Sequence, residues 1–401
     1  MTLRHNAQVS SSRKVFAILS AAVLAGCASH PRQPRAQVPD WESQDVGSAP
    51  RQSRPIPAPT RIASPAPPAK PTILQQGPSA ETWVSLNRWS RAKGFKEPCR
   101  LDGHGCLPHP SYSINTSNGV LVLRTGSQSA FWDGLELRLG FAPQLIDDQP
   151  FVHALDLKKT IEPLIGGAGM SFLKPGPVIV IDPGHGGENP GTRSVLGNRY
   201  EKEFTLDWAR RLEGLLITNG WQVFLTRTND TDLSLSNRVA FAQEHKAGLF
   251  LSLHFNSAGA KEDQEGLETY CLTPSGMPST VTRGFGDDLA LGFPNNIFDE
   301  ENLQFAFRVH RALLQTNGFR DRGVRHARFL GVLRWQERPA ILVEGGYLSN
   351  PREARLIADP AYRQKLAEAV AGALCENPGA SRQRSEVRSQ KPEGRPTAPL
   401  L

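Results

Sequence analysis

The hydrophobic pattern changes character part-way along the chain. From about residue 178 onward, short runs of apolar residues alternate with longer stretches in which apolar residues recur every three or four positions. The first run, Val178–Ile181, is entirely β-branched and predicts a strand buried on both faces. The next stretch places Phe204, Trp208 and Leu212 on one face of a helix that Asn219–Gly220 closes. Strands separated by helices of this length predict an α/β fold, a mostly parallel sheet flanked by helices.

The same reading predicts the other elements of this region. Strands are expected at 221–226, 248–254, 266–272, 329–334 and 340–344, with 266–272 at an edge of the sheet. Helices are expected at 203–218, 235–244, 300–315, 351–359 and 361–375. The segment 275–300 is rich in Gly, Pro and Asn. Its composition disfavours a stable helix and suggests a substrate loop, and a regulatory role stays open.

A smaller α+β pattern precedes this region. A strand running into an amphipathic helix is expected over 82–95, followed by strands at 111–115, 120–125 and 136–139, a hairpin at 144–153 and a helix at 155–164. This pattern resembles the small module named for the N-terminal stalk of copper amine oxidases. The resemblance implies a spacer or a cell-wall contact, and no copper. We therefore expect a module at 81–165 and a catalytic domain at 176–376.

The first residues predict export. Arg4, Arg13 and Lys14 precede the apolar run 15–24, which is too short to span a bilayer but fits a secretory signal peptide over 1–26. The tetrad that ends at Cys27 resembles a bacterial lipobox, which implies lipidation of that cysteine. The alternative is an ordinary signal peptide. Lipidation implies a periplasm-facing lipoprotein of the cell envelope, and Ala28 favours the outer membrane.

Both ends of the remaining chain are polar and basic. The segment 27–80 contains twelve prolines and predicts a disordered, semi-extended tether, and 377–401 predicts a disordered basic tail. The signal peptide, the tether and the tail carry about +3 each, and residues 81–378 carry about −2, which gives the net charge of +7. This distribution gives no support for a folded nucleic-acid-binding face and favours contact with anionic wall or membrane surfaces.

The other cysteines predict one crosslink. Cys99 and Cys106 enclose a turn-rich loop that a disulfide could close in an oxidising compartment. A metal site with the neighbouring histidines is the alternative, but the spacing matches no standard zinc pattern.

Polar side chains stand where buried strands end or a helix begins. His185 follows the strand 178–182, His254 and Glu344 each end an apolar run, and Glu201 starts the helix after the first strand. Each alone has a structural explanation, such as a core histidine or a helix N-terminal charge. Because the carboxyl ends of parallel strands share one edge, we expect them to converge. Two imidazoles and a carboxylate are the ligand set of a catalytic zinc, and a second carboxylate can move a proton.

Six motifs make the resemblance specific. They occur in the order Ile181-Asp-Pro-Gly-His-Gly-Gly187, Tyr200-Glu-Lys202, Leu225-Thr-Arg-Thr-Asn-Asp230, Ser252-Leu-His-Phe-Asn256, Arg322-Gly-Val324 and Val343-Glu-Gly-Gly-Tyr-Leu-Ser-Asn350. Residues 177–375 thus resemble the zinc-dependent N-acetylmuramoyl-L-alanine amidases of the amidase 3 type. Gly345-Gly346-Tyr347 departs from the usual bulky residue, Gly and Phe after the glutamate, which looks tolerable.

The resemblance implies a peptidoglycan hydrolase that cleaves the amide between N-acetylmuramic acid and L-alanine of the stem peptide. Carried over by position, His185, Glu201 and His254 would bind one Zn²⁺, and Glu344 would be the catalytic carboxylate. Asn256 and Arg322 are candidates for substrate contact or for support of the site, with a structural role as the alternative for each. The rival functions are a zinc peptidase acting on another wall amide and a non-catalytic wall-binding scaffold. The sequence does not identify an activating protein partner.

Overall fold

The computed structural model describes residues 82–102, 108–166, 178–281 and 287–375. The predicted signal peptide, Cys27, the tether, Cys106 and the tail lie outside these residues, and their predictions stay untested. In the described part of the chain, no helix is both long and apolar enough to cross a membrane.

The fold is α/β, with a mixed sheet flanked by helices. The carboxyl-terminal half supplies six strands: β9 (Val178–Pro183), β10 (Gln222–Leu225), β11 (Leu249–Asn256), β12 (Leu267–Cys271), β13 (Asp321–His326) and β14 (Ala340–Tyr347). Their order is β10-β9-β11-β14-β12-β13, and the first four run parallel to one another. The strand β12 pairs antiparallel with β14 and parallel with β13. The carboxyl ends of β9, β11 and β14 therefore share one edge of the sheet.

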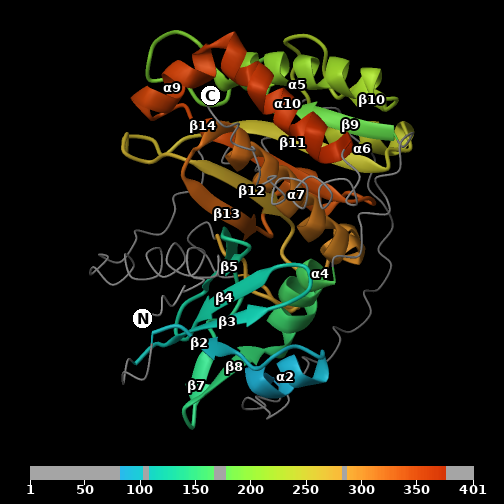
Figure 1. Cartoon of the computed structure of the whole chain (residues 1–401). Helices are drawn as coiled ribbons and strands as arrows, with labels where there is room; N and C mark the ends of the chain where they lie inside the picture. Colours follow the sequence, from blue (N-terminus) through green and yellow to red (C-terminus); the bar gives the residue numbers. More distant parts are fainter. Residues whose placement is uncertain (1–81, 103–107, 167–177, 282–286, 376–401) are drawn as a thin grey trace, which may run out of the picture.

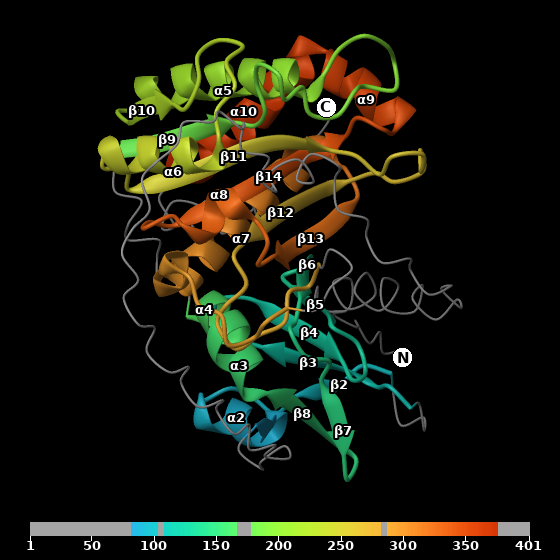
Figure 2. The same ribbon diagram turned by 180° about the vertical axis from the view of Figure 1, so that it is seen from behind.

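Helices cover both faces of this sheet. One face carries α5 (Glu201–Thr218), α7 (Asp299–Asn317) and α10 (Pro360–Cys375), of which α7 and α10 lie in front of the sheet in Figure 1. The other face carries α6 (Leu235–Glu244) and α8 (Gly331–Arg334), and it is turned towards the viewer in Figure 2. The helix α9 (Pro351–Ala358) follows β14. The predicted apolar face of α5 is confirmed, since Phe204, Trp208 and Leu212 are fully or almost fully buried.

The amino-terminal module is joined to this sheet. Its elements are β1 (Trp83–Ser85), α2 (Leu86–Ala92), β2 (Cys99–Arg100), β3 (Ser111–Asn115), β4 (Val120–Arg124), β5 (Ser129–Trp132), β6 (Leu135–Arg138), β7 (Gln144–Ile146), β8 (Gln149–His153), α3 (Ala154–Asp156), the π-helix η3 (Leu157–Ile161) and α4 (Glu162–Ile165). The strands β1, β8 and β7 form a small separate sheet, whereas β2 to β6 continue the main sheet to eleven strands. The join is a parallel pairing of Val324 on β13 with Leu137 on β6. Both halves thus share one sheet (Figure 1).

Two sequence predictions about strands were wrong, and other strands were not predicted. Residues 329–334 contain the helix α8, because a short apolar run does not distinguish a strand from a buried helix. The true strand, β13, reads Asp-Arg-Gly-Val-Arg-His and is too polar to have been recognised. The strand β12 lies inside the sheet and not at its edge, because β13 and the module continue the sheet beyond it. The strand β5, which forms a hairpin with β6, was not predicted.

The described parts of segment 275–300 lie away from the carboxyl ends of β9, β11 and β14. Because β12 runs antiparallel to β14, the chain leaves β12 at the opposite edge of the sheet. There Asn295 donates to the carbonyl of Arg338, just before β14 begins. Arg328 donates to the carbonyls of Pro274 and Met277 and holds the segment at this edge. Its one described helical turn is the 3-10 helix η4 (Pro294–Phe298), in keeping with the prediction of no stable long helix.

Candidate active site

Three predicted ligands meet at the carboxyl edge of the sheet. His185 follows β9, Glu201 is the first residue of α5, and His254 lies near the end of β11. The Nε2 atom of His185 is 3.1 Å from Oε2 of Glu201, and Nδ1 of His254 is 2.9 Å from Oε1 of the same carboxylate. One potential ligand atom from each residue lies within 4.8 Å of the others. All three side chains are buried. The structure thus brings them together at one edge of the sheet, as the sequence pattern predicted.

The three side chains pack closely against two glycines. A Cβ atom on Gly184 would overlap the imidazole of His254, and one on Gly191 would lie 2.7 Å from Oε2 of Glu201 and 2.7 Å from Cδ2 of His185. Gly191 has a φ of +68°, a conformation that glycine adopts without strain. Glycine at both positions is therefore required for the side chains to approach one another.

The orientation of His185 depends on its own loop. Its φ is +62°, in the left-handed region, and its Nδ1 atom lies 2.9 Å from Oδ1 of Asn189. This contact turns Nε2 toward Glu201. A partner of this kind fixes the tautomer and orientation of a metal-binding imidazole. Asn189 was not found from the sequence, because an asparagine four residues after a histidine in a Gly-rich loop has no distinctive pattern.

Two buried arginines hold the same loop from behind. Arg227 donates to the carbonyls of Pro183 and Gly184 at 3.0 and 2.9 Å. Arg238 donates to the carbonyls of Pro183 and His185 at 3.1 and 2.9 Å. Arg238 also pairs with the buried Asp182 at 2.6 Å. Two guanidinium groups thus hold three successive backbone carbonyls. These hydrogen bonds account for the positive φ of His185, a conformation that residues other than glycine rarely adopt.

Glu201 remains a carboxylate in this buried position. Burial raises its pKa, but the neighbouring His185 and hydrogen bonds from both imidazoles outweigh burial and lower the pKa below its usual value. Its oxygens also accept hydrogen bonds from the backbone of Phe255 and Thr192, each at 3.0 Å. Burial lowers the pKa of His254, which favours the neutral imidazole that a metal requires.

Glu344 occupies the adjacent strand. It is 1% exposed and lies beside His254 in the pairing of β14 with β11. Its Oε2 atom has no hydrogen-bond partner among the described residues. Burial raises its pKa well above the usual value, and the charges of Glu201 and Glu268 raise it further. A buried carboxyl group that tends to keep a proton thus stands next to the His–Glu–His cluster.

This arrangement agrees with the comparison to known proteins. Residues 179–376 match the sequence profile of the Amidase_3 family, described as N-acetylmuramoyl-L-alanine amidase. Residues 179–376 of this chain therefore form an Amidase_3 domain. The Amidase_3 domain starts in β9 and ends just after α10, so it contains every strand that bears a candidate ligand.

Individual relatives show the same extent of similarity. The chain is 31% identical over 221 residues to the amidase AmiC of Neisseria meningitidis, covering 49% of this chain and 52% of that protein. It is 31% identical to AmiC of Escherichia coli, covering 54% and 56%. The chain spans about half the length of these curated relatives.

Solved structures match the same part of the chain. One is the catalytic domain of the amidase CwlV from Bacillus (Paenibacillus) polymyxa var. colistinus, with 31% identity, 49% of this chain and 96% of that chain covered, and a TM-score of 0.41. Another is the amidase AmiC2 of Nostoc punctiforme, with 32% identity, coverage of 49% and 94%, and a TM-score of 0.41.

Glu268 is an Amidase_3-domain residue that the sequence reading missed. It is buried on β12, directly opposite Glu344. Its oxygens accept hydrogen bonds from Asn256 at 2.8 Å, from the Tyr270 hydroxyl at 2.7 Å and from Arg322 at 2.7 Å. Asn256 and Arg322, the two predicted support residues, thus meet at this carboxylate. The sequence signal that could have revealed Glu268 is a single charged residue within the predicted strand, in the run Leu-Glu-Thr-Tyr.

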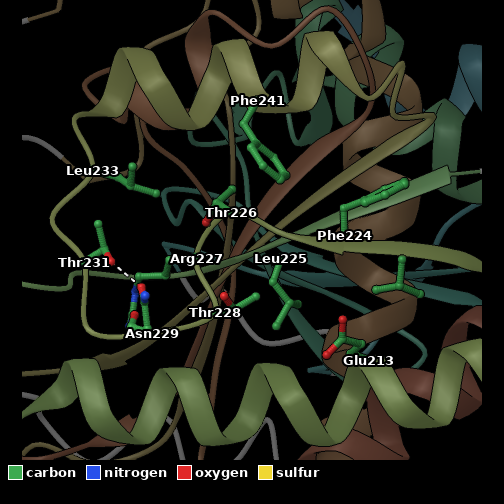
Figure 3. Close-up of a pocket in the computed structure, with 11 residues that line it drawn as sticks. Glu213, Phe224, Leu225, Thr226, Arg227, Thr228, Asn229, Thr231, Leu233 and Phe241 are labelled. Carbon is green, nitrogen blue, oxygen red and sulfur yellow. Dashed lines mark hydrogen bonds between the residues drawn. The ribbon is translucent and has the colours of Figure 1, made fainter.

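Two other features lie apart from the ligand cluster. A cavity of about 470 Å³ opens beside β10, between α5 and α6, and Figure 3 shows Phe224, Arg227 and Phe241 among its lining residues. None of the candidate ligands lines it. Cys99 is exposed, and because Cys106 lies outside the described residues, the disulfide between them stays a prediction.

Proposed function

We propose that this chain is a zinc-dependent N-acetylmuramoyl-L-alanine amidase. It would hydrolyse the amide between the lactyl group of N-acetylmuramic acid and L-alanine of the stem peptide in peptidoglycan. The observation that carries the proposal is the convergence of His185, Glu201 and His254 beside Glu344, whose Oε2 atom has no hydrogen-bond partner among the described residues. The two AmiC relatives, both named N-acetylmuramoyl-L-alanine amidase, support it.

The donor set fits Zn²⁺. Two imidazole nitrogens and one carboxylate oxygen are the protein ligands found in many catalytic zinc sites, and one ion per chain would be held by His185, Glu201 and His254. When bound, the ion supplies Lewis acidity that polarises a carbonyl and lowers the pKa of water. The glycines at 184 and 191 leave the clearance that the donors need.

Glu344 would be the proton carrier. Its Oε2 atom is free to accept a proton from the attacking water, and its raised pKa favours keeping that proton until the C–N bond breaks. The proton would then pass to the leaving L-alanine nitrogen. Asn256 and Arg322 would act through Glu268, which fixes the charge opposite Glu344.

The cellular setting is part of the same proposal. A signal peptide at 1–26 and a lipid anchor at Cys27 would place the protein in the cell envelope, facing the periplasm, on the outer membrane. The tether 27–80 would let the enzyme reach the wall, and the copper amine oxidase-like module 81–165 would act as a stalk. The cleavage assay also tests whether the enzyme needs a protein activator.

The test uses a soluble form comprising residues 81–378, with and without Glu344→Gln. We expect about one zinc per chain in both proteins and release of intact stem peptides from purified sacculi by the unmodified protein alone. Fragments cut within the peptide would indicate a zinc peptidase instead. Bound zinc without any product would indicate a missing activator, and the absence of both zinc and product would favour a wall-binding scaffold.

A further inference from the structure

A row of polar residues crosses the sheet from the candidate active site to the amino-terminal module. Glu344 on β14 faces Glu268 on β12, and Tyr270 on β12 faces Arg325 on β13. Residues paired across neighbouring strands project from the same face of a sheet, and so do alternate residues along one strand. Arg325 therefore lies on the same face as Glu344.

The row continues into the module through β6. Val324 on β13 pairs with Leu137 on β6, and both are fully buried. The next residue on each strand, Arg325 and Arg138, projects to the opposite face. Arg325 and Arg138 therefore lie on neighbouring strands and project from the same face of the sheet.

The three arginines of the row outnumber the carboxylates with which they pair directly. Arg322 and Arg325 share one carboxylate, with Nε to Oε1 distances of 2.7 and 3.4 Å to Glu268. Arg138 pairs with Glu136 at 2.8 Å. Three guanidinium groups thus face two carboxylates. A surplus cation held in a partly buried place favours the approach of an anion.

Arg138 is the member with free hydrogen-bonding capacity. Its Nε atom is buried and has no hydrogen-bond partner among the described residues, while its side chain is 22% exposed. Burial lowers the pKa of Arg138, its partner Glu136 opposes this change, and the charges of Arg325 and Arg322 add to it. A guanidinium group is well suited to a carboxylate partner.

The position of Arg138 is fixed relative to the Amidase_3 domain. Asp321 at the start of β13 accepts from the backbone N–H of Glu136 at 2.7 Å and from that of Gly323 at 2.7 Å. A Cβ atom on Gly323 would lie 3.0 Å from the carbonyl oxygen of Glu136, so glycine permits this approach. The module therefore presents Arg138 on a rigid strand.

We propose that Arg138, together with Arg322 and Arg325, binds a carboxylate of the stem peptide during cleavage. Strands lie about 4.8 Å apart, so β6 is roughly 14 Å from β14. An extended peptide covers about 3.3 Å per residue, so this span corresponds to the carboxylate-bearing residues beyond L-alanine. The subsite rests on the proposed amidase function. It makes the amino-terminal module part of the substrate-binding surface.

The test compares two stem-peptide muropeptides, one with free carboxyl groups and one with the same groups converted to amides. We expect the unmodified protein to have at least about tenfold higher kcat/KM for the carboxylate form, the value of one charge-assisted hydrogen bond. Arg138→Gln lowers kcat/KM for the carboxylate form more than for the amide form, so most of the preference is lost, and Arg138→Lys keeps part of it. Arg124→Gln, which alters an exposed arginine of the same module, keeps the full preference.

A binding experiment separates this proposal from the amidase proposal. Calorimetry with Glu344→Ala protein and the two free stem peptides requires no turnover. Tighter binding of the carboxylate peptide, lost in the double variant with Arg138→Gln, supports the subsite even if sacculi are not cleaved. Equal affinity for both peptides overturns the subsite even if cleavage proceeds. In the kinetic test, a fall in kcat/KM in Arg138→Gln that is the same for both muropeptides overturns it too.

Discussion

Glu344 and Glu268 face each other across the pairing of β14 with β12, yet their environments differ in charge. Glu268 is held by Arg322 and Arg325, and although burial raises its pKa, these cations outweigh burial and lower it. Glu344 has only burial and neighbouring carboxylates, which raise its pKa. The two adjacent carboxyl groups thus differ in their tendency to hold a proton. This pattern assigns the acid–base chemistry to Glu344.

Replacing Glu268 with glutamine should shift the pH dependence of activity. Loss of the Glu268 charge removes one cause of the raised Glu344 pKa and leaves Arg322 uncompensated, and both effects lower the pKa of Glu344. We therefore expect the acid limb of the kcat/KM profile to move to lower pH. Glu136→Gln is the matched control, because Glu136 pairs with Arg138 on the same face without facing Glu344. An unchanged acid limb in Glu268→Gln would contradict this reading.

Loss of the Arg238 side chain should weaken metal binding. Arg238 holds the carbonyl of His185 and pairs with Asp182, so Arg238→Gln frees the ligand loop. Supporting residues around a metal site are typically worth about 10- to 100-fold in affinity. Competition with a chelator would measure the change. Arg211→Gln, on the outer side of α5, should retain full affinity, and equal zinc affinity in both variants would count against the clamp.

Gly191→Ala should abolish metal binding by crowding. The new methyl group would stand 2.7 Å from the Glu201 carboxylate, and the backbone has a φ of +68°. Gly197→Ala separates the two causes, because Gly197 also has a positive φ but no atom lies within 4 Å of the added carbon. We expect zinc to be retained in Gly197→Ala and lost in Gly191→Ala, as measured by metal analysis after dialysis. Loss in both variants would point to backbone strain alone.

The stability of the protein should fall as pH rises from about 4 to about 6 through one buried carboxyl group. Burial raises the pKa of Asp156 to about 6 from 3.8, against hydrogen bonds from Gly140 and Phe141. Because the folded pKa is the higher one, the folded state keeps a proton that the unfolded chain releases between these values. The stabilisation is therefore complete below the lower pKa and is lost as pH rises through the higher one, a difference of about 3 kcal/mol.

Urea denaturation of the unmodified protein and Asp156→Asn at several pH values would test this. The neutral amide does not titrate, so the difference in unfolding free energy should move in favour of the variant as pH increases from 4 to 7. A difference that stays constant across this range would show that Asp156 does not retain its proton in the folded state.

Much of the candidate site could be predicted because each proposed ligand interrupts a regular pattern. His254 and Glu344 end apolar runs, and His185 follows a β-branched strand, so the shared edge of a parallel sheet brings them together. Asn189, Arg238 and Glu268 could not be found in this way. Their roles depend on contacts with backbone carbonyls or with a facing strand, which leave no periodic trace.

The fold, like the candidate site, could be predicted only in part. Amphipathic helices such as α5 and the buried strands were recognised because their periodicity is strong. The strand β13 was missed because its polar residues serve the charged row and the Asp321 contacts. The join between the two halves rests on the pairing of residues far apart in sequence, Leu137 and Val324, and local patterns carry no information about it.

The shared sheet has a consequence for any attempt to isolate the Amidase_3 domain. If the chain began at β9, the strand β13 would lose β6 and expose its backbone N–H and C=O groups along an open edge. Such an edge pairs readily with another chain. We therefore expect a protein cut at the family boundary to self-associate and precipitate, whereas one that begins before β1 stays monodisperse in size-exclusion chromatography. The module would then serve as the built-in protection of an aggregation-prone edge.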